Sequence, residues 1–352
     1  MPKETMTPRE RWLAVVRRER PDRIPMHYRA TGEATQKLLS YLGCRSAEEM
    51  FDRLHIDRNA GVGPRYVGPP IPPGEDMYGR RYQEVPYEGG VYRECAYHPL
   101  AGYETVGEIE RNTSWPTPDW FDYSGIPGQV EGAEDRVISG GGSEPFLLYK
   151  DLRGEEQAFM DLLLHPDIVH YCLERLYGFC YENARRIYEQ IPGKVMVTSV
   201  AEDMGAQDRL LYSREHLQVF FFPHMKRMID LAHQAGAYVN THSDGAIGEI
   251  LPDLIEMGVD IINPVQWRCK GMDRERLKRD FGERLIFEGG VDNQYTLPFG
   301  TTEEVRQEVR DNFRILGAGG GYILGPCHNI QAVGPPENVV AMYETGYEEG
   351  WM

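Results

Sequence analysis

The sequence predicts an α/β protein that forms a single (β/α)8 TIM barrel over residues 1–352. Eight short apolar runs alternate with helical segments, as expected when parallel strands are each followed by a helix. Polar side chains follow most of these runs, and such proteins build their sites at the carboxyl ends of the strands. One irregular segment, at about 63–135, interrupts the alternation after the second run and predicts an insertion.

The first part of the chain opens with a helix that begins after Thr7. Its side chain can accept a hydrogen bond from the first turn, and Pro8 suits the first helical position. The pattern then predicts strand 23–29, helices 33–42 and 46–54, and strand 56–62.

The insertion at about 63–135 is rich in proline, glycine and tyrosine. Its short alternating runs, 77–84 and 91–97, predict a β-hairpin. The aromatic residues between Trp115 and Tyr123, and six tyrosines before them, could line a cavity for a flat ligand, form a partner interface, or pack on one another as a loop subdomain.

The second part of the chain resumes the alternation. Strands are predicted at 136–142, 194–200, 237–242, in a run ending at Asn263, at 284–290 and at 320–328. Helical segments are predicted at 151–190, 214–235, 247–256 and 302–316, with Ser213 and Thr301 as caps. An open doubly wound sheet is the alternative, but no Gly-x-Gly-x-x-Gly follows a strand where that fold needs one.

Charge and composition limit the classes of partner. The formal net charge of −17 disfavours nucleic acid and anionic membranes. No stretch approaches the ~18 consecutive apolar residues of a membrane span, and the first ten residues hold no apolar core, which predicts a soluble, cytoplasmic protein. The six cysteines form no Cys-x-x-Cys pair, so free thiols are expected.

Polar residues near the carboxyl ends of the predicted strands suggest a lined pocket. The set comprises His27, Arg29, Asp57, Glu202, Asp203, His242, Asp244, Asn263, Gln266, Glu288, Asp292, Cys327 and His328. Substrate-binding roles are predicted for His27, Asn263, Gln266, Glu288 and His328.

His242, Asp244 and Cys327 are the candidate metal ligands. Imidazole, carboxylate and thiolate are the ligands that zinc prefers, and a catalytic zinc site keeps a fourth position open. Each residue also has a structural explanation: Asp244 could cap the helix 247–256, His242 could be a hydrogen-bonded inner residue, and Cys327 a small buried one.

Glu202 and Asp203 follow the fourth strand, where either carboxylate could be a further ligand, a general acid/base or a surface charge. Glu288 is followed by two glycines, which could let a phosphate approach the backbone or make a tight turn.

Four stretches of the chain resemble the uroporphyrinogen decarboxylase superfamily: 20–25, 240–266, 288–292 and 322–331. The resemblance covers most of the chain in order and is weakest across the insertion. It implies one (β/α)8 barrel and two possible chemistries, which are the cofactor-free decarboxylation of uroporphyrinogen and zinc-dependent methyl transfer between a corrinoid protein and a thiol.

The decarboxylase branch has an arginine-rich motif, Met-Arg-Gln-Ala-Gly-Arg-Tyr, at its first strand. Here the run from Met26 to Gly32 keeps only Arg29. In a decarboxylase acting on a uroporphyrinogen-like or other carboxylated molecule, Arg29 would hold a carboxylate and Asp57 would stabilise the protonated intermediate.

The methyltransferase branch has His-x-Cys at the fifth strand and a cysteine at the eighth. This chain offers His242-Ser-Asp244 and Cys327, so a carboxylate replaces one thiolate. The leading hypothesis is a zinc-dependent methyltransferase, with Glu202 as a possible further ligand, a corrinoid supplied by a partner protein, and a homodimer as in related barrels. A non-catalytic barrel that binds a tetrapyrrole or a partner through the insertion is the third hypothesis.

Overall fold

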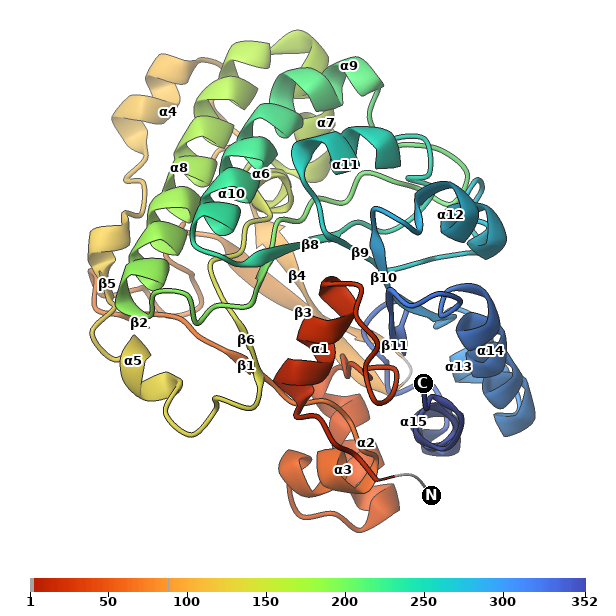
Figure 1. The fold of residues 1–352 in the computed structure, drawn as a ribbon. Helices are drawn as coiled ribbons and strands as arrows, with labels where there is room; N and C mark the ends of the chain where they lie inside the picture. Colours follow the sequence, from red (N-terminus) through yellow and green to blue (C-terminus); the bar gives the residue numbers. More distant parts are fainter. Residues whose placement is uncertain (1–2, 88) are drawn as a thin grey trace.

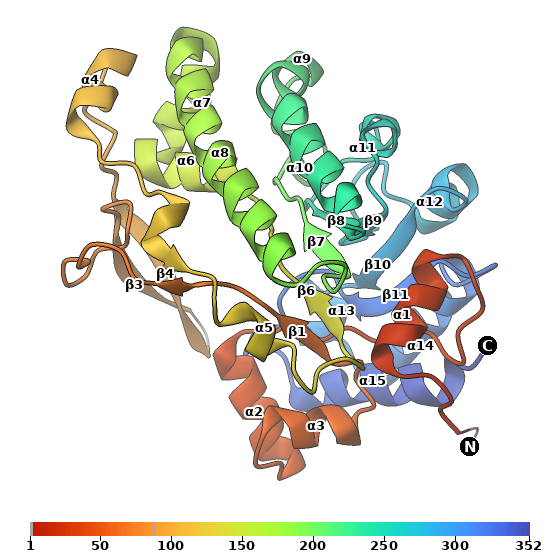
Figure 2. The same ribbon diagram turned by 60° about the vertical axis from the view of Figure 1, so that its left-hand side comes forward.

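The computed structural model describes residues 3–87 and 89–352, and its centre is a curled sheet of parallel strands with helices around its outside (Figures 1 and 2). The strands are adjacent in chain order: β1 (Asn59–Gly61), β6 (Val137–Ser139), β7 (Val197–Ser199), β8 (Tyr238–His242), β9 (Ile261–Asn263), β10 (Ile286–Val291) and β11 (Tyr322–Pro326). Every residue of β9, β10 and β11 is buried, as expected for strands covered on both faces. The predicted α/β class is therefore confirmed.

The predicted first strand, 23–29, joins this sheet by a single bridge. Met26 pairs in parallel with Leu324 of β11, and the amide of His27 donates to the Leu324 carbonyl over 2.8 Å. On its other side, the amide of Asp57 donates to the Met26 carbonyl over 3.0 Å. Backbone hydrogen bonds thus run from β11 through this segment to the residues that lead into β1.

Helices with one buried face cover the sheet. They are α1 (Pro8–Val16), α2 (Gly32–Leu42), α3 (Ala47–Arg53), α6 (Pro145–Arg153), α7 (Glu155–Leu164), α8 (Pro166–Gln190), α10 (Phe222–Gln234), α11 (Leu251–Met257), α12 (Arg274–Phe281), α13 (Thr296–Phe299), α14 (Thr302–Ile315) and α15 (Pro336–Glu349). The short α9 (Arg214–His216) has no buried residue. No helix among the described residues is long and apolar enough to span a membrane.

Three predicted helical segments differ in detail from those observed. The segment 151–190 is divided at Gly154, whose φ of +85° ends α6, and at Pro166, where α8 begins. The segment 214–235 contains a π-helical turn, Leu217–Phe221, just before Pro223, which lacks the amide that a regular ladder needs. The segment 247–256 becomes helical only at Leu251.

The segment between β1 and β6 holds the predicted β-hairpin, formed by β3 (Arg81–Tyr87) and β4 (Gly90–Tyr97). Figure 2 shows it on the opposite side of the molecule from α12 and α14. The other elements of the segment are β2 (Arg65–Tyr66), α4 (Val106–Asn112), a 3-10 turn (Pro118–Trp120), β5 (Phe121–Asp122) and α5 (Ile126–Gln129). Its aromatic residues line a hollow of about 470 Å³ that includes Tyr66, Tyr78 and Trp120.

Helix α1 closes the amino-terminal end of the curled sheet. Its Trp12 and Val15 belong to a buried apolar cluster to which the first residues of several strands contribute. These strand residues are Val137, Val197, Ile261, Ile286 and Ile323. Trp12 thereby becomes the floor of the space that the sheet encloses.

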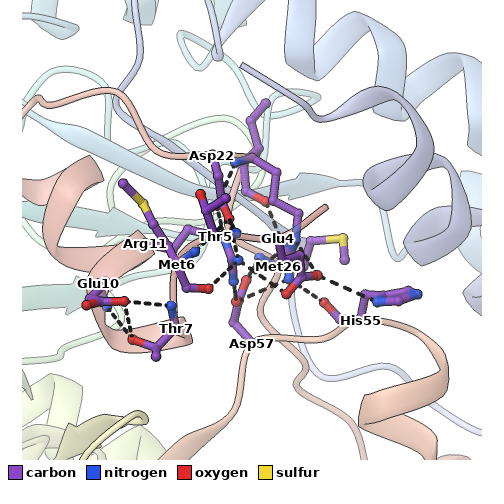
Figure 3. A network of polar contacts seen from close by, with 12 residues as sticks. Glu4, Thr5, Met6, Thr7, Glu10, Arg11, Asp22, Met26, His55 and Asp57 are labelled. Carbon is purple, nitrogen blue, oxygen red and sulfur yellow. Dashed lines mark hydrogen bonds and ion pairs between the residues drawn. The ribbon is translucent and has the colours of Figure 1, made fainter. Parts of the chain in front are cut away.

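A buried ion-pair network fixes this end of the molecule (Figure 3). The carboxylate of Asp57 contacts the guanidinium groups of Arg11 and Arg23 and accepts a hydrogen bond from the amide of Met26 over 2.7 Å. Arg11 also contacts Asp22, with Nε to Oδ1 at 2.7 Å. The side chains of Asp57, Arg11 and Arg23 are all buried, so each of these charges is stabilised by the others instead of by water.

We expect Asp57→Asn to lower the free energy of unfolding by about 3–5 kcal/mol, because it leaves two buried guanidinium groups short of a counter-charge. Urea unfolding followed by circular dichroism measures this. The control is Asp52→Asn, since Asp52 is exposed and pairs with Arg58 at the surface, a pair worth about 0–1 kcal/mol. Equal losses in the two variants would contradict a structural role for the network.

Candidate active site

A cavity of about 390 Å³ lies inside the curled sheet, above Trp12. Its lining comes from α1, from the 25–29 segment and from the strands. The lining residues are Trp12, His27, Tyr28, Arg29, Asn59, Val137, Ser139, Val197, Ser199, Asn240, His242, Asn263 and Glu288. Five predicted site residues, His27, Arg29, His242, Asn263 and Glu288, are therefore brought together around one space.

Alternation along the strands sets the depth of each side chain in the cavity. On β8, the side chains of Asn240 and His242 face the cavity. The alternate residues Val239 and Thr241 are buried on the opposite face of the strand. His242 is two residues nearer the carboxyl end, so it lies roughly 7 Å closer to the mouth. The loop that follows carries Asp244 out to the rim.

The imidazole of His242 is oriented by Asn263. Its Nδ1 lies 2.8 Å from the carboxamide oxygen of Asn263. That oxygen can only accept, so it places the imidazole proton on Nδ1 and leaves a lone pair on Nε2. That Nε2 faces Asp244, 3.9 Å from its Oδ1. A guanidinium nitrogen of Arg29 also lies 3.3 Å from Nδ1, but a guanidinium can only donate, so this approach is a contact and not a second hydrogen bond.

Asp244 lies between two imidazoles at the mouth. Its Oδ2 is 3.8 Å from Nε2 of His328, and its Oδ1 is buried without a hydrogen-bond partner. One ligand atom from each of His242, Asp244 and His328 lies within 4.8 Å of the others. Two imidazoles and one carboxylate are a donor set that zinc accepts, and an unpaired buried carboxylate oxygen is costly unless something binds it, so the residues fit a metal ion.

The loop carrying Asp244 is fixed from both sides. The amide of Asp244 donates to Asp203 over 3.1 Å, and the amide of Gly245 donates to the side-chain oxygen of Gln266 over 2.7 Å. Burial raises the pKa of Asp244, with His242 opposing and Asp203 adding to the shift. Asp244 does not cap a helix, because α11 begins at Leu251 after Ile250.

Cys327 is outside this three-residue group. Its thiol donates to the carbonyl of Val265 over 3.1 Å, and burial raises the pKa of the thiol well above its ordinary value. The next residue, His328, points toward Asp244 instead. The structure thus joins two of the three predicted metal ligands with a residue that the sequence had assigned to substrate binding.

At the deeper level, His27 and Glu288 form a pair. His27 Nδ1 contacts Glu288 Oε1, and the side-chain amide of Asn240 donates to Glu288 Oε2. Burial alone would raise the pKa of Glu288, but the electrostatic contact and hydrogen bond from the His27 ring, with help from Asn240, lower it. Asn240 was not predicted, although its position two residues before His242 places it on the same face.

Glu202 is buried behind the mouth and does not line the cavity. Its carboxyl group accepts hydrogen bonds from the amide of Phe146, over 2.9 Å, and from the hydroxyl of Tyr177. Burial raises the pKa of Glu202 to about 8, and burial beside Asp203 raises that of Glu144 to about 7. Glu144 was missed, although it follows the third predicted strand as the other site residues follow theirs.

Two remaining candidates lie elsewhere. Asp57 is in the network at the amino-terminal end, where both of its oxygens are bound by arginines. Asp292 accepts a hydrogen bond from Arg268 and from the amides at the start of α13, which makes it a turn-stabilising residue.

The fold and the site define a parallel α/β protein with a small cavity, lined by both polar and apolar side chains, and a cluster of residues at its mouth that can bind a metal. The family model for uroporphyrinogen decarboxylase (URO-D) matches residues 132–348, which is more than half of the chain. The chain belongs to the uroporphyrinogen decarboxylase family.

Individual relatives extend this comparison. The uroporphyrinogen decarboxylase of Nitrosococcus oceani is 24% identical over 218 residues, 60% of this chain and 54% of that protein. The one from Psychromonas ingrahamii is 30% identical over 91 residues, 26% of this chain and 24% of that protein. These matches span about half or less of the relatives' length. A methyltransferase from Methanosarcina mazei shares the fold with a TM-score of 0.69, at 18% identity, over 97% of this chain and 99% of that one.

Glu202 gives a pH-dependent prediction. Because its pKa is raised from about 4.5 to about 8 on folding, the native state retains a proton that the unfolded state loses, and stability falls as pH rises between these values. Relative to Glu202→Gln, the wild type should lose on the order of 1 kcal/mol per pH unit in this window.

Urea unfolding at pH 5.5, 6.5 and 7.5 measures the difference. The exposed Glu215→Gln serves as the control and should track the wild type. A constant difference between wild type and Glu202→Gln across the three pH values would show that Glu202 is ionised throughout.

Proposed function

We propose that the protein is a zinc-dependent methyltransferase that moves a methyl group between a corrinoid and a small acceptor or donor. The observation that carries this proposal is the convergence of His242, Asp244 and His328 at the mouth of a cavity, with one Asp244 oxygen buried and unpaired. The shared fold with a protein described as a methyltransferase supports it.

Three side chains would hold the metal: His242 and His328 through Nε2, and Asp244 through its carboxylate. Bound there, zinc would supply Lewis acidity, which lowers the pKa of an acceptor thiol or polarises a methylated oxygen. Asn263 would keep the imidazole of His242 in the tautomer that leaves Nε2 free, a role that outer hydrogen-bond partners of metal-binding histidines commonly have.

The cavity below would bind the small substrate and keep water from it. Its volume of about 390 Å³ suits a small molecule. The mouth, where Asp244 and His328 are only half-buried, would remain open to the corrinoid. We propose that a partner protein brings the corrinoid to this mouth.

Decarboxylation is the second candidate, because the relatives in Nitrosococcus oceani and Psychromonas ingrahamii carry that name. Uroporphyrinogen has eight carboxylates, which need several cationic partners. Among the described residues that line the cavity, Arg29 is the only arginine or lysine. Asp57, the proposed stabiliser of the intermediate, is bound by Arg11 and Arg23 instead. These features favour methyl transfer.

Metal analysis of the purified protein after dialysis against zinc tests the proposal. We expect close to one zinc ion per chain in the wild type, and loss of that zinc in His242→Ala and His328→Ala, because each variant removes one of three protein ligands. Inductively coupled plasma mass spectrometry gives the content.

Cys327→Ala is the matched control. Cys327 follows β11 directly, as His328 does, but its thiol donates a hydrogen bond to the carbonyl of Val265. The variant should keep its zinc. Loss of zinc in Cys327→Ala with retention in His328→Ala would instead assign the third ligand to Cys327. A wild type without stoichiometric metal would contradict a zinc methyltransferase and favour decarboxylation or ligand binding.

A further inference from the structure

The deep end of the cavity holds a carboxylate–imidazole pair that the proposed metal chemistry does not use. Glu288 is buried, with 2% of its side chain exposed, whereas 23% of the His27 side chain is exposed. Since both residues line the cavity, the exposed part of the pair is the His27 ring.

Hydrogen bonds define which nitrogen of His27 is available. Glu288 accepts the proton on Nδ1, and the side-chain NH2 of Asn59, which can only donate, faces Nε2, so Nε2 carries the lone pair of a neutral ring. The only described neighbour of Nε2 within hydrogen-bond distance is the side-chain amide of Asn59, at 3.3 Å. This contact is long, so another donor in the cavity could replace it. The negative charge of Glu288 makes Nε2 a stronger acceptor.

The His27–Glu288 pair lies deeper in the cavity than the residues at its mouth. Asn240, which contacts Glu288, is two residues before His242 on β8, and two strand residues span roughly 7 Å. A molecule with its reacting atom at the mouth would therefore place its other end near His27. A volume of about 390 Å³ admits such a molecule only if it is small.

The walls between these two ends are apolar and aromatic, with Trp12, Tyr28, Val137 and Val197 among them. Polar groups near them are mainly neutral carboxamides and hydroxyls. The only fully charged residue types in the described lining are Arg29 and Glu288, whose charges are opposite. An uncharged substrate with an apolar body and one polar end fits these walls best.

We propose that His27, held by Glu288, accepts a hydrogen bond from a hydroxyl group at the inner end of a small, uncharged, ring-containing substrate. This inference rests on the proposed function, because it names the class of molecule that would exchange its methyl group at the mouth. His27 contacts the substrate, and Glu288 is a positioning residue that acts through His27.

Two probes of similar shape test the hydrogen bond. Phenol can donate to His27 Nε2, whereas methoxybenzene cannot. Binding to the full-length protein, without zinc or corrinoid, is measured by nuclear magnetic resonance titration, with the histidine ring nitrogens as reporters. We expect phenol to bind roughly tenfold more tightly than methoxybenzene, as one hydrogen bond to a charge-supported acceptor predicts.

Variants locate the effect. The preference for phenol should disappear in His27→Phe, which lacks the accepting nitrogen. It should shrink in Glu288→Gln, which keeps an acceptor for Nδ1 of His27 but removes the negative charge. It should persist in the control His170→Phe, because His170 is an exposed residue of α8. Glu288→Gln also decides the matter if His27→Phe does not fold. Equal affinity of the wild type for the two probes, or an undiminished preference in Glu288→Gln and His27→Phe, would overturn the inference.

The outcome is separable from that of the metal analysis. A protein that binds no zinc but shows a His27-dependent preference for phenol would contradict the proposed function and support the hydroxyl site. A protein that binds zinc and does not distinguish the probes would contradict the hydroxyl site alone.

Discussion

The buried carboxylate of Asp57 is the constraint on which the geometry of this molecule depends. It joins Arg11 of α1 to Arg23 and the amide of Met26, which both belong to the segment 23–29. Through Arg11 it fixes α1, and α1 sets Trp12 as the floor of the cavity. Through Met26 it fixes the segment that carries His27 and Arg29 into the cavity. An ion pair with no contact to the cavity therefore determines where two of its polar residues lie.

Above that floor, the cavity is organised by the two-residue repeat of extended chains. His27 and Asn240 meet Glu288 at one level, and Arg29 and His242 meet each other at the next. The lower level is a hydrogen-bonded network whose groups are nearly all paired, which favours rigidity. The upper level ends at Asp244, which retains an unpaired buried oxygen. The site thus separates a region suited to recognition from a region suited to chemistry.

Much of the fold could be predicted because alternation of apolar runs and helices depends on local sequence. Seven of the eight predicted strands lie in one parallel sheet within the described residues, and the hairpin of the insertion is present. Side-chain direction was harder to predict, because it changes with each residue of an extended chain. Cys327 and His328 are adjacent, yet one bonds to Val265 and the other faces Asp244. Asp57 precedes β1 rather than following it, so it lies at the opposite end from the mouth.

The pairing of Met26 with Leu324 has a consequence for biosynthesis. During translation, the segment that carries His27 emerges long before its partner strand β11, because 298 positions separate Met26 from Leu324. Until then the segment has no neighbour on that side, and the enclosed space has no closed wall. Contacts between positions so distant in sequence form slowly, because the intervening chain must first be ordered. The nascent polypeptide would therefore expose this strand edge until β11 has been made, and unpaired strand edges favour aggregation.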